Sequence, residues 1–106
     1  MVREIWQEFG EFHFERRDLH LPLAVGQQLL AGLRERTPSD FAGDKVVGVA
    51  TLDGVKLIFE DESWILFRQS GTEPLLRIYC EATSVSKMTC LIDAGVKAAQ
   101  QAALGI

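Results

Sequence analysis

The segment Arg68-Gln69-Ser70-Gly71-Thr72-Glu73-Pro74-Leu75-Leu76-Arg77 is the most informative part of this sequence. One apolar run, residues 63–67, precedes it, and another, residues 78–80, follows it. Both runs are typical of strands, so the polar residues between them are predicted to form a loop at the edge of a sheet.

The residue types in this loop allow two interpretations. Two arginines, the hydroxyls of Ser70 and Thr72, and Gly71, which lets backbone N–H groups approach a ligand, together suit a phosphate cradle. Alternatively, Ser70 and Thr72 bond their own backbone in a hairpin loop and Arg68 lies in solvent. Spacing alone favours the second interpretation, because Ser, Gly, Thr and Pro are ordinary loop residues.

Length and charge narrow the class of protein. The 106 residues suit one domain with a modest core, and 47% hydrophobic with 25% charged residues is ordinary for a globular protein. The net charge of −4 argues against a nucleic-acid partner, since such proteins usually carry a basic face. No apolar run has the length of a membrane span and no signal peptide is visible, so we expect no membrane partner and a cytoplasmic location.

Periodicity predicts a short N-terminal helix over residues 2–9, ended by Gly10, and then two longer helices and five strands. Phe12 and Phe14 alternate with polar residues, as in a half-buried strand. Asp53-Gly54 and Asp61-Glu62 are predicted turns, and residues 37–43 a loop with Phe41 turned inward. The strands are predicted at 11–19, 45–51, 55–60, 63–68 and 75–82, and the longer helices at 21–36 and from Thr83 or Ser84 to about residue 103.

The order β-α-β-β-β-β-α predicts an α+β fold in two layers, with an antiparallel sheet of four to five strands and helices on one face. Val55, Leu57 and Phe59 are predicted to face the core. Cys80 and Cys90 are predicted to be buried, reduced thiols.

Residues 68–81, R-Q-S-G-T-E-P-L-L-R-I-Y-C-E, closely resemble the phosphate-binding signature of the alpha-D-phosphohexomutases, which include phosphoglucomutase, phosphomannomutase and phosphoglucosamine mutase. That signature lies in the fourth, C-terminal domain of those enzymes, which has a fold likened to the TATA-binding protein. The resemblance implies that residues 1–106 are this single domain, and that residues 1–10 are a helix leading in from a third domain.

The resemblance also implies roles for residues in the loop. Arg68, Ser70 and Thr72 would contact the non-transferred phosphate of a hexose phosphate, with Gly71 contributing its backbone. Arg77 is a further candidate, although strand alternation also allows it to pair with Glu81 or Glu73. The supporting residues would be Glu73, which positions an arginine or caps the loop, and Pro74, which stiffens the loop exit.

The parent enzyme would be an isomerase that moves a phosphoryl group within its substrate, between the 1 and 6 positions of a phosphosugar. The resemblance places its phosphorylated serine, its Mg²⁺ site and its sugar-recognition loop in other domains. We therefore expect no catalytic residue and no metal ligand here, and no activity from the isolated chain.

Two rival interpretations remain open: a stand-alone, non-catalytic module that binds a phosphorylated metabolite, and a structural interaction domain. The remaining polar residues have simple structural explanations. His13 and His20 are expected at the surface, and the acidic residues 60–62 are expected to form a solvated turn that discourages edge aggregation.

Overall fold

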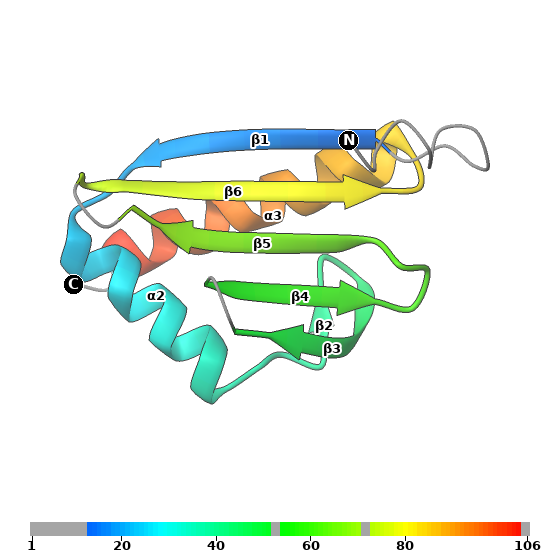
Figure 1. The fold of residues 1–106 in the computed structure, drawn as a ribbon, viewed down its shortest axis with the longest axis horizontal. Helices are drawn as coiled ribbons and strands as arrows, with labels where there is room; N and C mark the ends of the chain where they lie inside the picture. Colours follow the sequence, from blue (N-terminus) through cyan, green and yellow to red (C-terminus); the bar gives the residue numbers. More distant parts are fainter. Residues whose placement is uncertain (1–12, 52–53, 71–72, 105–106) are drawn as a thin grey trace.

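The computed structural model describes residues 13–51, 54–70 and 73–104. Its strands form one antiparallel sheet in the order β1-β6-β5-β4-β3-β2. In Figure 1, helix α3 lies behind this sheet, and α2 lies to the left of β3 and β4. The elements are β1 (His13–His20), α2 (Leu23–Glu35), β2 (Asp40–Phe41), β3 (Asp44–Ala50), β4 (Val55–Phe59), β5 (Trp64–Gln69), β6 (Leu75–Ala82) and α3 (Val85–Leu104).

The predicted two-layer α+β fold is confirmed, but the sheet has six strands rather than four to five. The additional strand is β2, which lies within the predicted loop at residues 37–43. Ala42 and Gly43 have φ values of 56° and 85°, which make a tight turn that folds β2 back onto β3. Phe41 is turned inward as predicted, with its ring 6.1 Å from that of Phe67 and 6.5 Å from that of Phe59.

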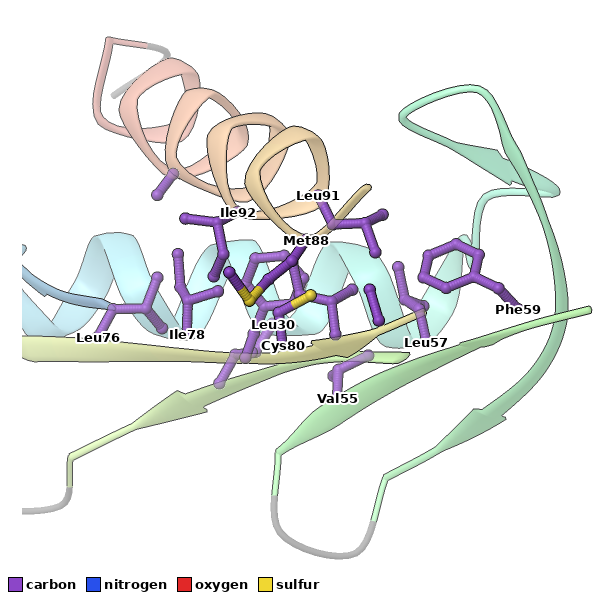
Figure 2. Close-up of a cluster of buried hydrophobic side chains, with 14 of the residues drawn as sticks. Leu30, Val55, Leu57, Phe59, Leu76, Ile78, Cys80, Met88, Leu91 and Ile92 are labelled. Atoms are coloured by element: carbon purple, nitrogen blue, oxygen red, sulfur yellow. The ribbon is translucent and has the colours of Figure 1, made fainter. Parts of the chain in front are cut away.

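The core fills the space between the sheet and the two helices (Figure 2). The predicted inward face of β4, formed by Val55, Leu57 and Phe59, is confirmed, since each side chain is almost completely buried. Each such side chain contributes about 1.5–3 kcal/mol to the free energy of folding through apolar burial. The other strands and the helices supply Ile65, Phe67, Leu76, Ile78, Cys80, Met88, Leu91, Ile92 and Ala99.

The side of strand β1 that faces the core is not the side that carries its aromatic residue Phe14. Leu19 pairs with Leu76 and packs on the core side, whereas Phe14 is 42% exposed on the face of the sheet opposite α2 and α3. There the Phe14 ring lies 6.4 Å from Trp64 and 6.3 Å from Tyr79. His20 at the end of β1 is exposed as predicted, while His13 is half-buried.

Helix α3 begins as predicted. The Ser84 Oγ accepts a hydrogen bond from the Lys87 N–H at 3.1 Å, and the Ser84 carbonyl accepts one from the Met88 N–H at 2.9 Å. Neither helix in the described ranges has the length and apolar character of a membrane span.

The prediction for the two cysteines is half right. Cys80 is buried in β6, where desolvation and the nearby charges of Glu15 and Glu81 raise the pKa of its thiol to about 12. Cys90 is exposed, so its predicted burial is wrong. It follows Met88 by two helical positions, or about 200°, and therefore faces away from the buried stripe of α3.

The predictions for residues 2–9, Gly10, Phe12 and Asp53 fall outside the described residues.

Candidate functional site

The strands on either side of the loop lie close to their predicted bounds: β6 begins at Leu75 as predicted, and β5 continues one residue further than predicted, through Gln69. Residues 70–74 make the connection, and both arginines lie in strands. Arg68 and Arg77 are directly opposite one another in the β5–β6 pair. Phe67 and Ile78, their neighbours in the chain, are fully buried on the helix side. Because side chains alternate along a strand, the two guanidinium groups project from the sheet face opposite α2 and α3. Among the described residues no helix covers this face, which is called the helix-free face below.

Like charges on directly opposite strand positions destabilise a sheet unless another charge compensates them. Neither arginine has a hydrogen bond or ion pair with any residue in the described ranges, and the Nε of Arg77 is buried without a partner there. Asp18, the register neighbour of Arg77 in β1, instead pairs with Arg16 at 3.6 Å. An oxyanion would supply the missing acceptors, since two guanidinium forks suit phosphate oxygens.

The sequence also allowed Arg77 to pair with Glu81 or Glu73. Neither ion pair occurs in the part of the chain that the structure describes. The Glu81 Oε1 instead accepts a hydrogen bond from the Trp64 Nε1 at 3.1 Å.

The connection is held by bonds within its own backbone. The Ser70 N–H donates to the Leu75 carbonyl at 2.9 Å, and the Leu75 N–H donates to the Glu73 carbonyl at 2.7 Å. The Ser70 Oγ accepts from the Glu73 N–H at 3.3 Å, so this hydroxyl bonds the loop backbone as the structural alternative predicted. Gly71 and Thr72, the other two predicted contacts, lie outside the described residues.

The loop is also attached to the chain that enters α2. The Pro74 carbonyl accepts a hydrogen bond from the Leu21 N–H at 3.0 Å. Gln69, which the sequence analysis did not single out, lies against the first turns of α2 at Gly26. The signal was available in part, since alternation from Phe67 places Gln69 on the helix side of β5.

The acidic residues 60–62 do not form a metal centre. Asp61 accepts hydrogen bonds from the Ser63 N–H at 3.0 Å and the Thr83 hydroxyl at 3.3 Å, and forms an ion pair with Lys87. Across the described residues, no group of three or more His, Cys, Asp or Glu side chains is arranged to hold a metal ion.

The fold and the arginine pair therefore define a two-layer α+β domain with a candidate oxyanion site at one hairpin. Residues 30–98 match the family described as phosphoglucomutase/phosphomannomutase, C-terminal domain. Since this match covers more than half of the sequence, the chain belongs to that family.

Comparison with individual proteins agrees with this assignment. A phosphoglucomutase/phosphomannomutase of Thermococcus kodakarensis is 40% identical over 67 residues, which are 63% of this chain and 14% of that protein. A probable phosphoglucosamine mutase of Pyrococcus horikoshii is 47% identical over 81 residues, which are 76% of this chain and 17% of that protein. The chain thus spans less than a fifth of the length of either relative.

A solved structure shares the fold. The crystal structure of a phosphoglucomutase/phosphomannomutase family protein from Burkholderia thailandensis superposes with a TM-score of 0.63 at 23% identity. The match covers 93% of this chain and 19% of that protein, so one compact part of the larger protein corresponds to almost all of the present chain.

Proposed function

We propose that this chain is the C-terminal domain of a phosphohexomutase, and that it clamps the non-transferred phosphate of a hexose phosphate during intramolecular 1-/6-phosphoryl transfer. The observation that carries the proposal is the pair Arg68 and Arg77, directly opposite on neighbouring strands and without partners in the described part of the chain. Membership of the family supports the class of enzyme.

In this proposal Arg68 and Arg77 supply forked donors to the phosphate oxygens from the helix-free face of the sheet. Ser70 and Thr72 supply hydroxyl groups, and Gly71 supplies backbone. Glu73 and Pro74 support the loop from behind, consistent with the bonds of Glu73 to Ser70 and of Pro74 to Leu21.

The task of such a clamp is positioning. A phosphosugar that exchanges its 1- and 6-phosphates must present either end to the reacting centre, and one fixed phosphate site serves both orientations. The energy gained by binding the non-transferred phosphate is used to orient the phosphate that reacts. Following the resemblance to the phosphohexomutases, we assign the Mg²⁺ of the parent enzyme, and its nucleophile, to other domains. Turnover would therefore require those domains as partners.

An alternative function is a stand-alone module that binds a phosphorylated metabolite without catalysis. It would use the same arginine pair and would bind phosphosugar without converting it. Conversion of the bound sugar by the whole protein that carries this domain separates the two functions.

The clamp is tested by Arg68→Lys in that whole protein. An ammonium keeps the charge but cannot reproduce two parallel N–H donors, so we expect phosphosugar affinity to fall roughly tenfold to a hundredfold, or about 1.5–3 kcal/mol. Thr72→Val should show a smaller loss of the same sign. The dissociation constants for glucose 1-phosphate, mannose 1-phosphate and glucosamine 1-phosphate are measured by calorimetry, with thermal midpoints beside them.

Arg34→Lys is the matched control, because Arg34 is an exposed arginine in the last turn of α2. The phosphosugar affinity of this variant should equal that of the unaltered protein. Unchanged affinity in Arg68→Lys would return the loop to a purely structural role.

A further inference from the structure

Gln69 is seated in a gap that exists only because residue 26 is glycine. It is the last residue of β5, and its side chain reaches the first turns of α2. A Cβ added to Gly26 would lie 1.5 Å from the Gln69 Oε1 and 2.7 Å from its Cδ. No side chain larger than hydrogen at position 26 is compatible with this placement of the carboxamide.

The seated carboxamide spans the base of the loop. Its Nε2 donates to the Leu75 carbonyl at 3.2 Å and approaches the Ser70 carbonyl at 3.4 Å. Ser70 and Leu75 are the residues at which the chain leaves β5 and enters β6. One side chain therefore joins both legs of the connection that carries the candidate phosphate contacts.

This arrangement is not the most stable choice for the position. The Oε1 of Gln69 is buried and has no hydrogen-bond partner within the described ranges. An unsatisfied buried acceptor destabilises a fold, and glycine inside a helix has poorer helix propensity than alanine. An alanine at position 26 with a smaller apolar residue at position 69 would avoid both costs. Local stability therefore does not explain the pair.

A hydrogen bond attaches the other leg of the loop to the chain that enters α2. The Leu21 N–H, two residues before α2 begins, donates to the Pro74 carbonyl at 3.0 Å. The first leg of the loop is thus placed against α2 by the packing of Gln69 beside Gly26, and the second is bonded to the chain before α2 through Pro74 and Leu21.

We propose that Gln69 is a positioning residue for the phosphate site, and that Gly26 is the seat that holds it; this inference rests on the proposed clamp. Because successive side chains point to opposite faces of a strand, fixing Gln69 on the helix side fixes the direction in which Arg68 leaves the helix-free side. A binding site needs this kind of support, since small displacements of its contact groups lose affinity.

The test uses Gly26→Ala, Gln69→Ala and the double variant, in the whole protein that carries this domain. The new methyl group of Gly26→Ala displaces the end of a flexible side chain, so the fold can adapt while the bridge across the loop is lost. We expect affinity for the tightest-binding of glucose 1-phosphate, mannose 1-phosphate and glucosamine 1-phosphate to fall roughly threefold to tenfold in each single variant. The double variant should be no weaker than Gln69→Ala alone.

Gly32→Ala is the matched control. Gly32 lies in the same helix, and an added Cβ there meets no atom within 4 Å. Both glycine variants gain helix propensity, so neither thermal midpoint should fall. Only Gly26→Ala should lose affinity and show faster hydrogen exchange at the Ser70 amide, a combination that a general loss of stability would not produce.

Including Arg68→Lys in the series separates the two proposals. Lower affinity in Arg68→Lys together with unchanged affinity in Gly26→Ala overturns the positioning role and leaves the clamp standing. Additive losses in the double variant also overturn it, because the two residues would then act independently. Unchanged affinity in Arg68→Lys, or no binding of any of the three sugars, overturns the clamp and the positioning role together.

Discussion

The two hairpin connections at the ends of strand β5 differ in the charged residues beside them. The connection from β4, residues 60–63, is acidic, and the connection to β6, residues 70–74, is flanked by the two arginines. At the acidic connection, Asp61 is ion-paired with Lys87 within the domain, whereas neither arginine has an ion pair with a described residue.

The acidic turn is attached to the start of α3. Lys87 pairs with Asp61 and, at 3.4 Å, with Asp44, while Thr83 donates to Asp61. Burial raises the pKa of Asp61, but the bonds from Lys87 and from the Ser63 N–H outweigh it and lower the pKa to about 2. Burial lowers the pKa of Lys87, and the bond to Asp61 outweighs that effect and raises it. The charge of Asp61 thus has a structural explanation, while Glu60 and Glu62 are exposed to solvent.

The arginine end has no such explanation within the described ranges. Arg68 and Arg77 face each other, and the nearest register carboxylate, Asp18, pairs elsewhere. A hairpin whose charges are matched internally serves the fold, whereas one whose charges oppose each other indicates a ligand from outside. The difference between the two ends is therefore the physical basis for proposing an oxyanion site at the arginine end.

Gly54→Ala should have the largest effect, because it disturbs the backbone of the arginine end. Gly54 has φ of +126°, and an added Cβ would lie 2.3 Å from the Phe67 carbonyl oxygen and 3.2 Å from the Arg68 Cα. Backbone strain and a clash with β5 together should lower the free energy of unfolding by about 3 kcal/mol. Denaturant unfolding at neutral pH measures this loss.

Gly43→Ala separates the two causes. Gly43 also has positive φ, at +85°, but an added Cβ meets nothing within 4 Å. Gly43→Ala should therefore lower the free energy of unfolding by only about 1 kcal/mol, from backbone strain alone. Equal losses in the two variants would mean that close approach to β5 is unimportant.

Much of this fold could be predicted from the sequence, because burial follows periodicity. The alternation over residues 55–59 and the apolar stripe of α3 each place side chains correctly against the core. Strand β2 was missed because turn-forming residues surround its two positions. Strand β5 was predicted to end one residue early, at Arg68, since Gln69 is polar and comes directly before turn-forming residues although its backbone continues β5.

Only part of the candidate site could be predicted from the sequence, because its geometry depends on how the strands and helices pack. The motif names Arg68 and Arg77, but their direct opposition depends on the register of β5 with β6. The seat of Gln69 on Gly26 joins residues far apart in the chain. Neither feature has a periodic signal, because both arise only when the strands and helices are packed.

Arg77→Gln tests whether the arginine pair binds a ligand or supports the sheet. If the arginine pair holds phosphate, removing one guanidinium should weaken phosphosugar binding by about tenfold. It should also relieve the repulsion across β5 and β6, so the domain should be no less stable, and at low salt slightly more so.

The two quantities are the dissociation constant and the thermal midpoint, measured at low and at high salt. A lower midpoint with unchanged affinity would show that Arg77 supports the sheet and not the ligand. Arg36→Gln, at the exposed end of α2, controls for loss of positive charge elsewhere in the domain.

Asp61→Asn examines the other end of β5 and should have the smallest effect. The folded-state pKa of Asp61, about 2, lies below the ordinary value of 3.8, so folding favours the ionised carboxylate. Its stabilisation is therefore fully present above about pH 4 and is lost as the pH falls towards 2. The side chain is 35% exposed, so solvent screening limits the contribution to about 1 kcal/mol.

The free energy of unfolding of the unaltered domain should accordingly be about 1 kcal/mol higher than that of Asp61→Asn at pH 7. This difference should disappear between about pH 4 and pH 2. Urea unfolding across this range measures it, with Glu62→Gln, an exposed neighbour in the same turn, as the control. A gap that stays constant with pH would mean that packing, and not the charge of Asp61, supports the turn. Phosphosugar affinity should be unchanged in Asp61→Asn, because its charge is used within the domain at the end of β5 remote from the arginines.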